Sequence, residues 1–534
     1  MPIEAPQQTW NQPPPRPPVD EYASNLPLRE AVARYGAEWA EELLGCAGTL
    51  AGSEEHRALA DAANLDRPRL SAGGDVLYAD AYHALIDRSI GLGAHALPWR
   101  EPRPGAHVAR AALFLLLSQA EPGHGCPVSM TCAAVPALRA EPELAAEWEP
   151  RLLSLAYEPE PRPATEKRGA LCGMAMTERQ GGSDVRASTT RAEPADEPGW
   201  WRLTGHKWFC SAPMSDLFLV LSQSPEGLSC FAMPRVLPDG TRNGFRIEAL
   251  KDKLGNHANA SAEIALEAAL ARPVGEPGRG VRTIVEMVNH TRLDCVLGTT
   301  AGMRGAVAEA LWHASHRRAF GALLLEQPLM RNVLADLCLE LEASTALAFR
   351  LAAAYDDPAE APFRRIATAV AKYWVCKRGP AHAAEALECL GGNGYVETYP
   401  LARRYREQPL LSIWEGSGNV VALDVLRAAR REPESLEALL AEIGLAAGAD
   451  PRLDEHVSRI RVDLEDETAA RRLVEGLALA LQGSLLVRHA PATVADAFCA
   501  ARLGDDRGAE YGTLPPRCDL GGILDRHLES ELGR

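Results

Sequence analysis

Met174-Ala-Met-Thr-Glu-Arg-Gln-Gly-Gly-Ser-Asp-Val185 is the most informative segment of the chain. Its adjacent glycines, Gly181 and Gly182, allow a ligand to approach the backbone closely. Thr177 and Ser183 place two hydroxyls six residues apart. A loop of this kind suits the edge of a planar polar ligand. Taken alone, the segment is equally consistent with a simple turn between two strands.

Four further segments follow in a fixed order. They are Gly205-His-Lys-Trp-Phe-Cys-Ser211, Arg317-Arg-Ala-Phe-Gly321, Leu390-Gly-Gly-Asn-Gly-Tyr395 and Ile413-Trp-Glu-Gly-Ser-Gly-Asn419. The five segments resemble the T-E-x-x-x-G-S-D, G-x-K-x-W-I-T-N, R-x-x-F-G, G-G-x-G and Y-E-G-T signatures of the acyl-CoA dehydrogenase family. The order is the same over residues of roughly 80 to 430. The chain is therefore identified as a member of this family.

The resemblance extends to the AidB-like subfamily of alkylation-response flavoproteins. It is carried by Glu178-Arg-Gln-Gly-Gly-Ser-Asp-Val185, Lys251-Asp-Lys-Leu-Gly-Asn256, Gln327-Pro-Leu-Met-Arg331 and Trp414-Glu-Gly-Ser-Gly-Asn419. It also includes an N-terminal arm and an extra C-terminal helical segment, so nearly the whole chain is covered.

The distribution of helical and strand patterns along the chain predicts an α+β protein with five parts. They are a Pro-rich arm (1–27), an N-terminal α-domain (28–168), a β-domain (169–276), a four-helix bundle (277–431) and an extra helical domain (432–534). Long helical patterns cover 281–319, 327–356, 361–391 and 413–431, as in a bundle. The arm is either a disordered tail or an ordered arm that wraps a neighbouring subunit. The family resemblance implies the same domain order and a homotetramer.

The resemblance also implies FAD, bound across a subunit interface. Thr177 and Ser183 match residues that hydrogen-bond the flavin, and Arg317 matches an arginine that meets the FAD pyrophosphate from the neighbouring subunit. Phe209 and Ser211 stand where the family has Trp and Thr, which keeps an aromatic plane and a hydroxyl. The other implied cofactor-binding residues are Met176, Gly182, Phe320, Gln327, Gly391, Gly392, Asn393, Gly394, Trp414, Gly416, Ser417 and Asn419.

Glu415 matches the catalytic base of the family. A carboxylate in a dry pocket suits removal of an α proton, because burial raises its pKa. Some relatives carry the base on a bundle helix, where this chain has Thr291, which cannot deprotonate a substrate. Arg292 matches an arginine near the acyl-CoA channel, or it forms a buried ion pair with Asp294 or Glu286.

Two functions follow as expectations. The first is α,β-oxidation of an acyl-CoA thioester, weak and restricted to short or branched chains, because Trp414 and Arg427 narrow the channel. The second is that of a flavin-containing, duplex DNA-binding or protective protein with residual dehydrogenase activity. The sequence identifies neither the physiological substrate nor the electron acceptor.

The charge of the chain bears on the second function. Lys and Arg total 56 and Asp and Glu total 72, a net charge of −16, and residues 431–534 alone carry −8. Duplex DNA requires clustered cations, so a DNA site would have to be a local stripe. The candidates are Arg459, Arg461, Arg471 and Arg472.

Other classes of site are disfavoured. His313 and His316 lack a carboxylate or Cys at ligand spacing, so we expect no metal. No G-x-G-x-x-G opens a helix after a strand, which disfavours a Rossmann site. The 12 cysteines form no C-x-x-C pair, and no apolar run is long enough to span a membrane, so we expect a cytoplasmic protein in a reducing compartment.

Overall fold

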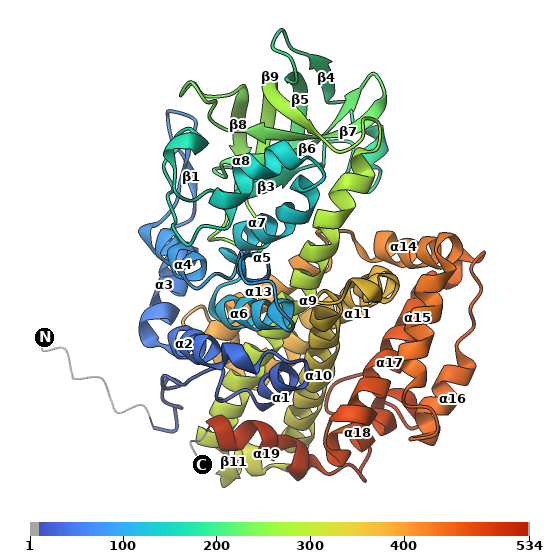
Figure 1. Ribbon diagram of the computed structural model, residues 1–534. Coiled ribbons are helices and arrows are strands. Elements are labelled where there is room, and N and C mark those ends of the chain that lie inside the picture. The colour runs from blue at the N-terminus through green and yellow to red at the C-terminus, as the bar shows by residue number, and fades with distance from the viewer. Residues whose placement is uncertain (1–9, 532–534) are drawn as a thin grey trace, which may run out of the picture.

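The computed structural model describes residues 10–531 and combines helical regions with one larger sheet (Figure 1). The first helical region consists of α1 (Leu26–Arg34), α2 (Glu41–Gly52), α3 (Glu54–Leu65), α4 (Asp80–Gly91), α5 (Leu97–Arg100), α6 (Ala106–Ala120), α7 (Gly125–Leu138) and α8 (Pro142–Leu152). Almost every residue of α6 and α7 is buried, as a helix that is apolar all round requires. A short hairpin of β1 (Arg69–Leu70) and β2 (Val76–Leu77) interrupts this region.

The sheet follows in sequence. Its strands are β3 (Cys172–Ala175), β4 (Arg191–Pro194), β5 (Trp201–Ser211), β6 (Leu217–Ser224), β7 (Gly227–Pro234), β8 (Phe245–Leu250) and β9 (Ser261–Val274). The order is β3-β6-β4-β5-β9-β7, β8 pairs with β9, and β6 also pairs with β7, so the sheet curls back on itself. Apolar residues of α7 and α8 form one core with β3, β6 and β7. This core fixes the sheet against the first helical region.

The bundle contains three long helices, α9 (Gly280–His316), α10 (Pro328–Ala354) and α11 (Ala361–Glu388). It continues with α12 (Gly392–Tyr395), α13 (Pro400–Leu411) and α14 (Gly418–Arg431), and the small strands β10 (Arg318–Ala319) and β11 (Ala322–Leu323) follow α9. The predicted helix over 413–431 is too long, because the helix begins only at Gly418. The residues before it form a loop that includes Glu415, whose backbone is left-handed (φ 58°).

The last region is helical, as predicted. It contains α15 (Pro433–Gly444), α16 (Pro451–Arg459), α17 (Ala470–His489), α18 (Ala492–Phe498) and α19 (Leu520–Glu531). Apolar residues of α16 to α19 share a core with α10. Figure 1 shows α15 to α18 along one side of the bundle, whereas α19 lies at its lower end, near β11. The α+β class with a helical, β, helical order is therefore confirmed.

From residue 10 onward, the N-terminal arm packs against its own chain. Trp312 donates its indole N–H to the carbonyl of Pro14 at 2.8 Å, and Arg304 contacts Ser24. The first nine residues of the predicted arm lie outside the described part of the chain. The arm thus packs along α9, and Asn11 reaches the backbone of Arg318 beyond the end of that helix.

Candidate functional site

A cavity of about 1770 Å³ lies between the sheet, helices α6, α7 and α9, and the segment that joins α13 to α14. Eleven of the predicted site residues line it: Met176, Thr177, Gly182, Ser183, Phe209, Ser211, Arg292, Trp414, Glu415, Gly416 and Ser417. They come from four separate parts of the sequence, three of which are motifs and the fourth of which is Arg292. The fold therefore brings the first, second and fifth motifs together around one cavity.

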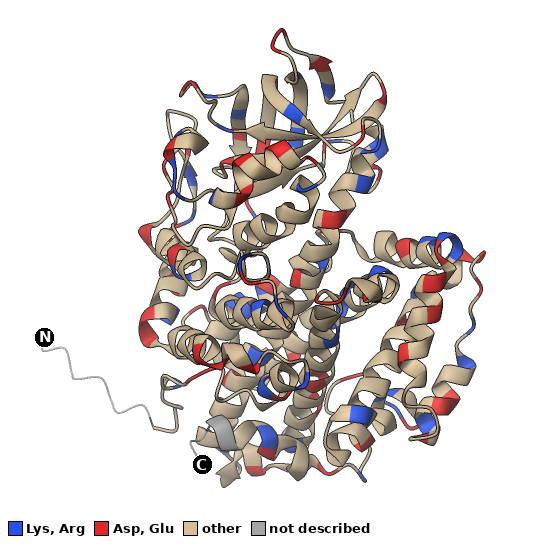
Figure 2. Ribbon diagram, in the orientation of Figure 1, with Lys and Arg blue, Asp and Glu red and all other residues tan. Residues whose placement is uncertain are grey.

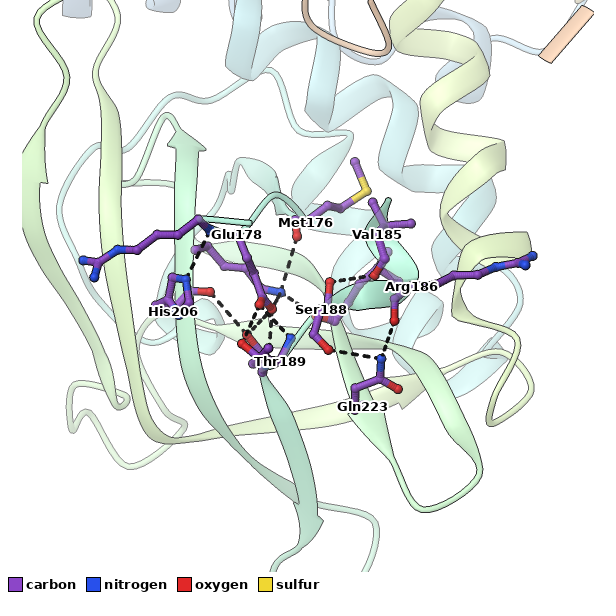
Figure 3. A network of polar contacts seen from close by, with 12 residues as sticks. Met176, Glu178, Val185, Arg186, Ser188, Thr189, His206 and Gln223 are labelled. Carbon is purple, nitrogen blue, oxygen red and sulfur yellow. Dashed lines mark hydrogen bonds and ion pairs between the residues drawn. The ribbon is translucent and has the colours of Figure 1, made fainter. Parts of the chain in front are cut away.

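The loop from Thr177 to Val185 is held by a buried ion pair beneath it (Figure 3). Lys207 donates to Glu178 at 3.0 Å, and Thr189 and Thr190 donate to the same carboxylate from both backbone and side chain. Burial opposes ionisation of Glu178, but Lys207 and these hydrogen bonds lower its pKa to about 2. The carboxylate is a structural anchor that turns the loop toward the cavity.

The same loop is tightly folded at its glycines. Gly181 has φ 124°, and a Cβ on Gly182 would lie 2.5 Å from the Thr177 hydroxyl. Only glycine therefore lets the loop keep Thr177 and Ser183 on the cavity wall. This arrangement suits contact with the edge of a flat polar ring, because the two hydroxyls lie beside glycine backbone that no side chain covers.

Glu415 also lines the cavity, in a left-handed conformation (φ 58°) that a non-glycine residue adopts only when its surroundings hold it. The Thr291 hydroxyl donates to its carboxylate at 2.8 Å, and Arg292 donates to its backbone carbonyl at 3.0 Å. Burial raises the pKa of Glu415, and Thr291, Arg292 and Lys372 oppose this increase. A carboxylate with a raised pKa is suited to act as a general base.

Lys372 is a site residue that the sequence analysis missed. Its side chain is buried on α11 and donates to the carbonyls of Ser412, at 3.2 Å, and Gly416. These two carbonyls lie on either side of Glu415 in the sequence. Lys372 therefore fixes the loop that presents the base. A lysine within the apolar run of residues 366–376 was the available signal.

Arg292 is a cavity-lining residue and also a partner in a buried ion pair. Its ion-pair partner is Asp424, at 2.7 Å. The expected partners were wrong, because Asp294 is bound by both terminal nitrogens of Arg110 and Glu286 is exposed. Asp424 also binds Arg365 at 3.0 Å. The arginine is thus held rigidly while it supports Glu415.

The remaining predicted cofactor residues do not line this cavity. They are Arg317, Phe320, Gln327, Gly391, Gly392, Asn393, Gly394 and Asn419. All but Asn419 lie near the far end of α9, where Arg317 donates to the carbonyl of Asn11 and Asn393 donates to Gln12. About 36 Å of helix separates Arg292 from His316, at about 1.5 Å per residue. The two groups of predicted residues are therefore well separated along α9.

Two of these residues, Phe320 and Asn419, differ from the rest in exposure or in their contacts. Phe320 is fully exposed in a left-handed turn (φ 53°) between β10 and β11. Asn419 opens α14 and accepts a hydrogen bond from Arg471 at 2.8 Å. The extra C-terminal region therefore contacts the segment that follows the base.

The four arginines considered for DNA binding are all exposed but differ in their partners. Arg459 forms ion pairs with Glu455 and Asp505. Arg471 contacts Asn419, whereas Arg461 and Arg472 form no ion pair with any residue between 10 and 531. Figure 2 shows acidic and basic positions interspersed over the helices that follow α14. They do not form a continuous basic stripe in that view.

Two other predictions concern metal and membrane. Within residues 10–531, no group of three or more His, Cys, Asp or Glu side chains is placed to bind a metal ion. His316 contacts the carbonyl of Trp312 through its ring nitrogen, and His313 is buried. None of the described helices is sufficiently long and apolar to cross a lipid bilayer.

Three family models match the chain. They are the N-terminal domain of the adaptive response protein AidB (residues 11–159), the middle domain of acyl-CoA dehydrogenase (173–269) and the C-terminal domain of acyl-CoA dehydrogenase (278–429). Together they include most of the chain and all five motifs.

Individual relatives agree with these models. The chain is 44% identical over 513 residues to the putative acyl-CoA dehydrogenase AidB of Escherichia coli K12, which covers 93% of this chain and 94% of the relative. It is 29% identical to acyl-CoA dehydrogenase family member 11 of Caenorhabditis elegans, over 74% of this chain and 68% of the relative.

Solved structures share the fold. ACDH-11 of C. elegans in complex with C11-CoA gives a TM-score of 0.83 at 24% identity, with 99% of this chain and 97% of that chain covered. The apo-form of Bd2924 gives 0.81 at 26% identity, with 90% and 99% covered. From these matches and the cavity, the chain belongs to the acyl-CoA dehydrogenase family, in its AidB-like branch, and has FAD as its cofactor.

Proposed function

We propose that the protein oxidises the α–β carbon bond of an acyl-CoA thioester. The proposal is carried by the position of Glu415, a carboxylate with a raised pKa. It lies on the wall of the same cavity that Thr177 and Ser183 line. Other carboxylates on the wall have different tasks. Asp294 and Asp424, for example, are taken up by arginines.

The residues divide the reaction between them. Glu415 removes the α proton of the thioester, and Thr291 and Arg292 orient that carboxylate and its backbone. Bound FAD supplies the acceptor for the hydride that leaves the β carbon. Thr177, Ser183 and Ser211 present hydroxyls from the sheet side of the cavity and would orient the ring. The substrate thus loses one proton and one hydride, and the enzyme gains both.

The acyl group is proposed to be short or branched. Trp414 and Arg427 both line the cavity, and Arg427 lies 3.5 Å from Asp424, which limits its movement. ACDH-11 of C. elegans, which shares the fold, has been solved in complex with C11-CoA, which has a longer chain. A panel of acyl-CoA compounds therefore has to include straight chains as controls.

The cofactor is proposed to lie between subunits. The residues near the end of α9 do not line the cavity of their own chain, so Arg317, Phe320 and Asn393 would complete the cavity of a neighbour. Arg317 suits this task because a guanidinium binds a pyrophosphate through two parallel hydrogen bonds. A homotetramer built from two such pairs is the proposed assembly.

Anaerobic titration of the FAD-loaded protein tests the reaction. Short and branched acyl-CoA compounds should bleach the visible absorbance of the flavin, whereas straight chains of eleven carbons should bleach it more slowly. Glu415→Gln should retain bound FAD without any bleaching. If no compound in the panel bleaches the wild-type flavin, the proposed reaction is wrong.

Binding of duplex DNA is the second candidate function. It is favoured by Arg461 and Arg472, which are exposed and have no acidic partner within the described part of the chain. It is disfavoured by the net charge of −16, because phosphate neutralisation supplies most non-specific affinity. Gel retardation at two salt concentrations tests it. The retarded band should weaken with salt and disappear in the Arg461→Glu, Arg472→Glu double variant, but persist in an Arg459→Glu control.

A further inference from the structure

Lys253 is a cation on the cavity wall for which the proposed reaction has no use. It follows β8 in the loop that precedes β9, and its side chain is partly buried. Its ammonium group donates to the carbonyl of Asn259 at 2.6 Å, the side chain of Asn256 at 3.3 Å and the hydroxyl of Ser261 at 3.3 Å. These three bonds use all three donors of a lysine.

The hydrogen bonds continue from Lys253 to the flavin side of the cavity. Ser261 is paired with Ser211 across strands β9 and β5, and their hydroxyl oxygens lie 3.3 Å apart. Lysine has no acceptor, so Ser261 has to accept from it and can then donate its own hydrogen to Ser211. The Ser211 hydroxyl can then donate its own hydrogen to a partner in the cavity.

The charge of Lys253 is not cancelled by an ion pair with any residue between 10 and 531. The acidic groups whose charge acts on Lys253 are Glu407 and Glu121. Both oxygens of Glu407 face the backbone N–H of Asn256 at 2.9 Å, and burial raises the pKa of Glu407 to about 7. Glu121 accepts from the backbone of Gly123 and from His124. Neither carboxylate reaches the ammonium group.

Protonation at neutral pH is consistent with this environment. Burial lowers the pKa of Lys253 to about 8, which keeps most of the side chain charged at pH 7. The thiol of Cys126, which lies beside Lys253 and Ser211, adds no charge, because burial raises its pKa to about 12. The flavin side of the cavity therefore has an unpaired positive charge close by.

We propose that Lys253 is a positioning residue for the flavin, which orients the Ser211 hydroxyl as a donor to the ring and favours the reduced cofactor through its charge. The proposal rests on the flavin lying against Ser211, as the proposed function requires. Two-electron reduction adds negative charge to the ring, and a nearby cation stabilises that charge in a medium of low dielectric constant. No bond is made or broken at Lys253.

The midpoint potential of bound FAD is the measurement that tests this. It is read by equilibrating the holoprotein with a reference dye under slow reduction by dithionite. Lys253→Met should lower the equilibrium constant for reduction by about tenfold, which is about 30 mV for two electrons. Ser261→Ala keeps the charge but loses the orientation, so its shift should be smaller and of the same sign. Lys253→Arg should restore most of the wild-type value.

Arg67→Met is the matched control. Arg67 is exposed and bonds Asp252 of the same loop at 3.0 Å, outside the hydroxyl chain. The midpoint potential of FAD in the Arg67→Met variant should equal that in the wild type. A wild-type potential in Lys253→Met overturns the proposal, as does a shift in Arg67→Met equal to that in Lys253→Met. Dithionite reduces the flavin without a thioester, so a protein that oxidises no acyl-CoA would contradict the proposed reaction and leave this result intact.

Discussion

Glu415 shows how much support one catalytic side chain requires. A left-handed backbone costs a non-glycine residue about 1–2 kcal/mol, and here three carbonyls around the base accept hydrogen bonds from buried cations. Arg292 holds the carbonyl of Glu415 itself, and Lys372 holds those of Ser412 and Gly416. The side chain is then free to face the cavity. The conformation is therefore a property of the surroundings rather than of the residue.

Replacing Lys372 with Met tests this support. The carbonyls of Ser412 and Gly416 would lose their buried donor, at a cost of about 1–3 kcal/mol in the free energy of unfolding. Activity should fall as well, because the loop can relax toward an ordinary conformation. Urea denaturation and flavin bleaching measure the two effects. Lys377→Met, on the same helix but exposed, should change stability by no more than about 0.5 kcal/mol. Equal losses in both variants would contradict the assigned role.

Glu415 should also control the pH dependence of the protein. Because burial raises its pKa, the base is ionised only above the ordinary range of a glutamate, and activity should rise with pH through this shifted value. Above this value Glu415→Gln should lower the rate by about 10²–10⁴-fold, and the difference should shrink as the wild-type base becomes protonated at lower pH. An acid limb at the pKa of an ordinary, solvent-exposed glutamate would contradict the assigned environment.

The same shift has a consequence for stability. A carboxyl whose pKa is raised on folding stabilises the protein fully below its unfolded pKa, and this contribution is lost as pH rises through the folded pKa. At pH 7 the Glu415→Gln variant should therefore unfold at a higher temperature than the wild type. The difference should vanish below the unfolded pKa of about 4. Calorimetry of the apoprotein at pH 7 and at a pH below about 4 measures the difference in unfolding temperature.

At the level of elements, the loop between β3 and β4 depends on a buried ion pair. Removing one partner of such a pair costs about 3–5 kcal/mol, because the other charge remains buried without compensation. Lys207→Met should therefore destabilise the protein by this amount and weaken FAD binding. The Glu178→Gln, Lys207→Met double variant should recover part of the stability in urea denaturation. A single variant as stable as the wild type would show that the pair does not anchor the loop.

The sequence predicted the helices better than it predicted the contacts between residues far apart in the chain. The patterns over 327–356 and 361–391 predicted α10 and α11 to within a few residues, because a packed helix carries its own periodicity. The motifs predicted the part of the site that lines the cavity. The contact of Lys207 with Glu178 spans 29 residues, and that of Lys372 with Gly416 spans 44. Such contacts arise only from tertiary packing, so a local pattern can mark a lysine as unusual but does not indicate its partner.

At the scale of the whole molecule, the two groups of predicted cofactor residues are well separated along α9, which favours the proposed site between subunits. This separation allows a test by mixing defective subunits. Glu415→Gln loses the base of its own cavity, and Arg317→Ala loses the residue that it would contribute to a neighbour's cavity. In a mixed pair, one site would combine the intact cavity of the Arg317→Ala chain with the intact Arg317 of the other chain.

Co-expression of the two variants with different affinity tags should therefore restore activity that neither has alone. Random pairing through a symmetric interface makes about half of the pairs mixed, and one of the two sites in each is intact, so about a quarter of wild-type activity should return. Two variants that both carry Glu415→Gln provide the control, because no pairing restores a base. If the purified mixed assembly is as inactive as either variant, the cofactor is held within one chain. The residues beyond α9 would then serve some purpose other than FAD binding.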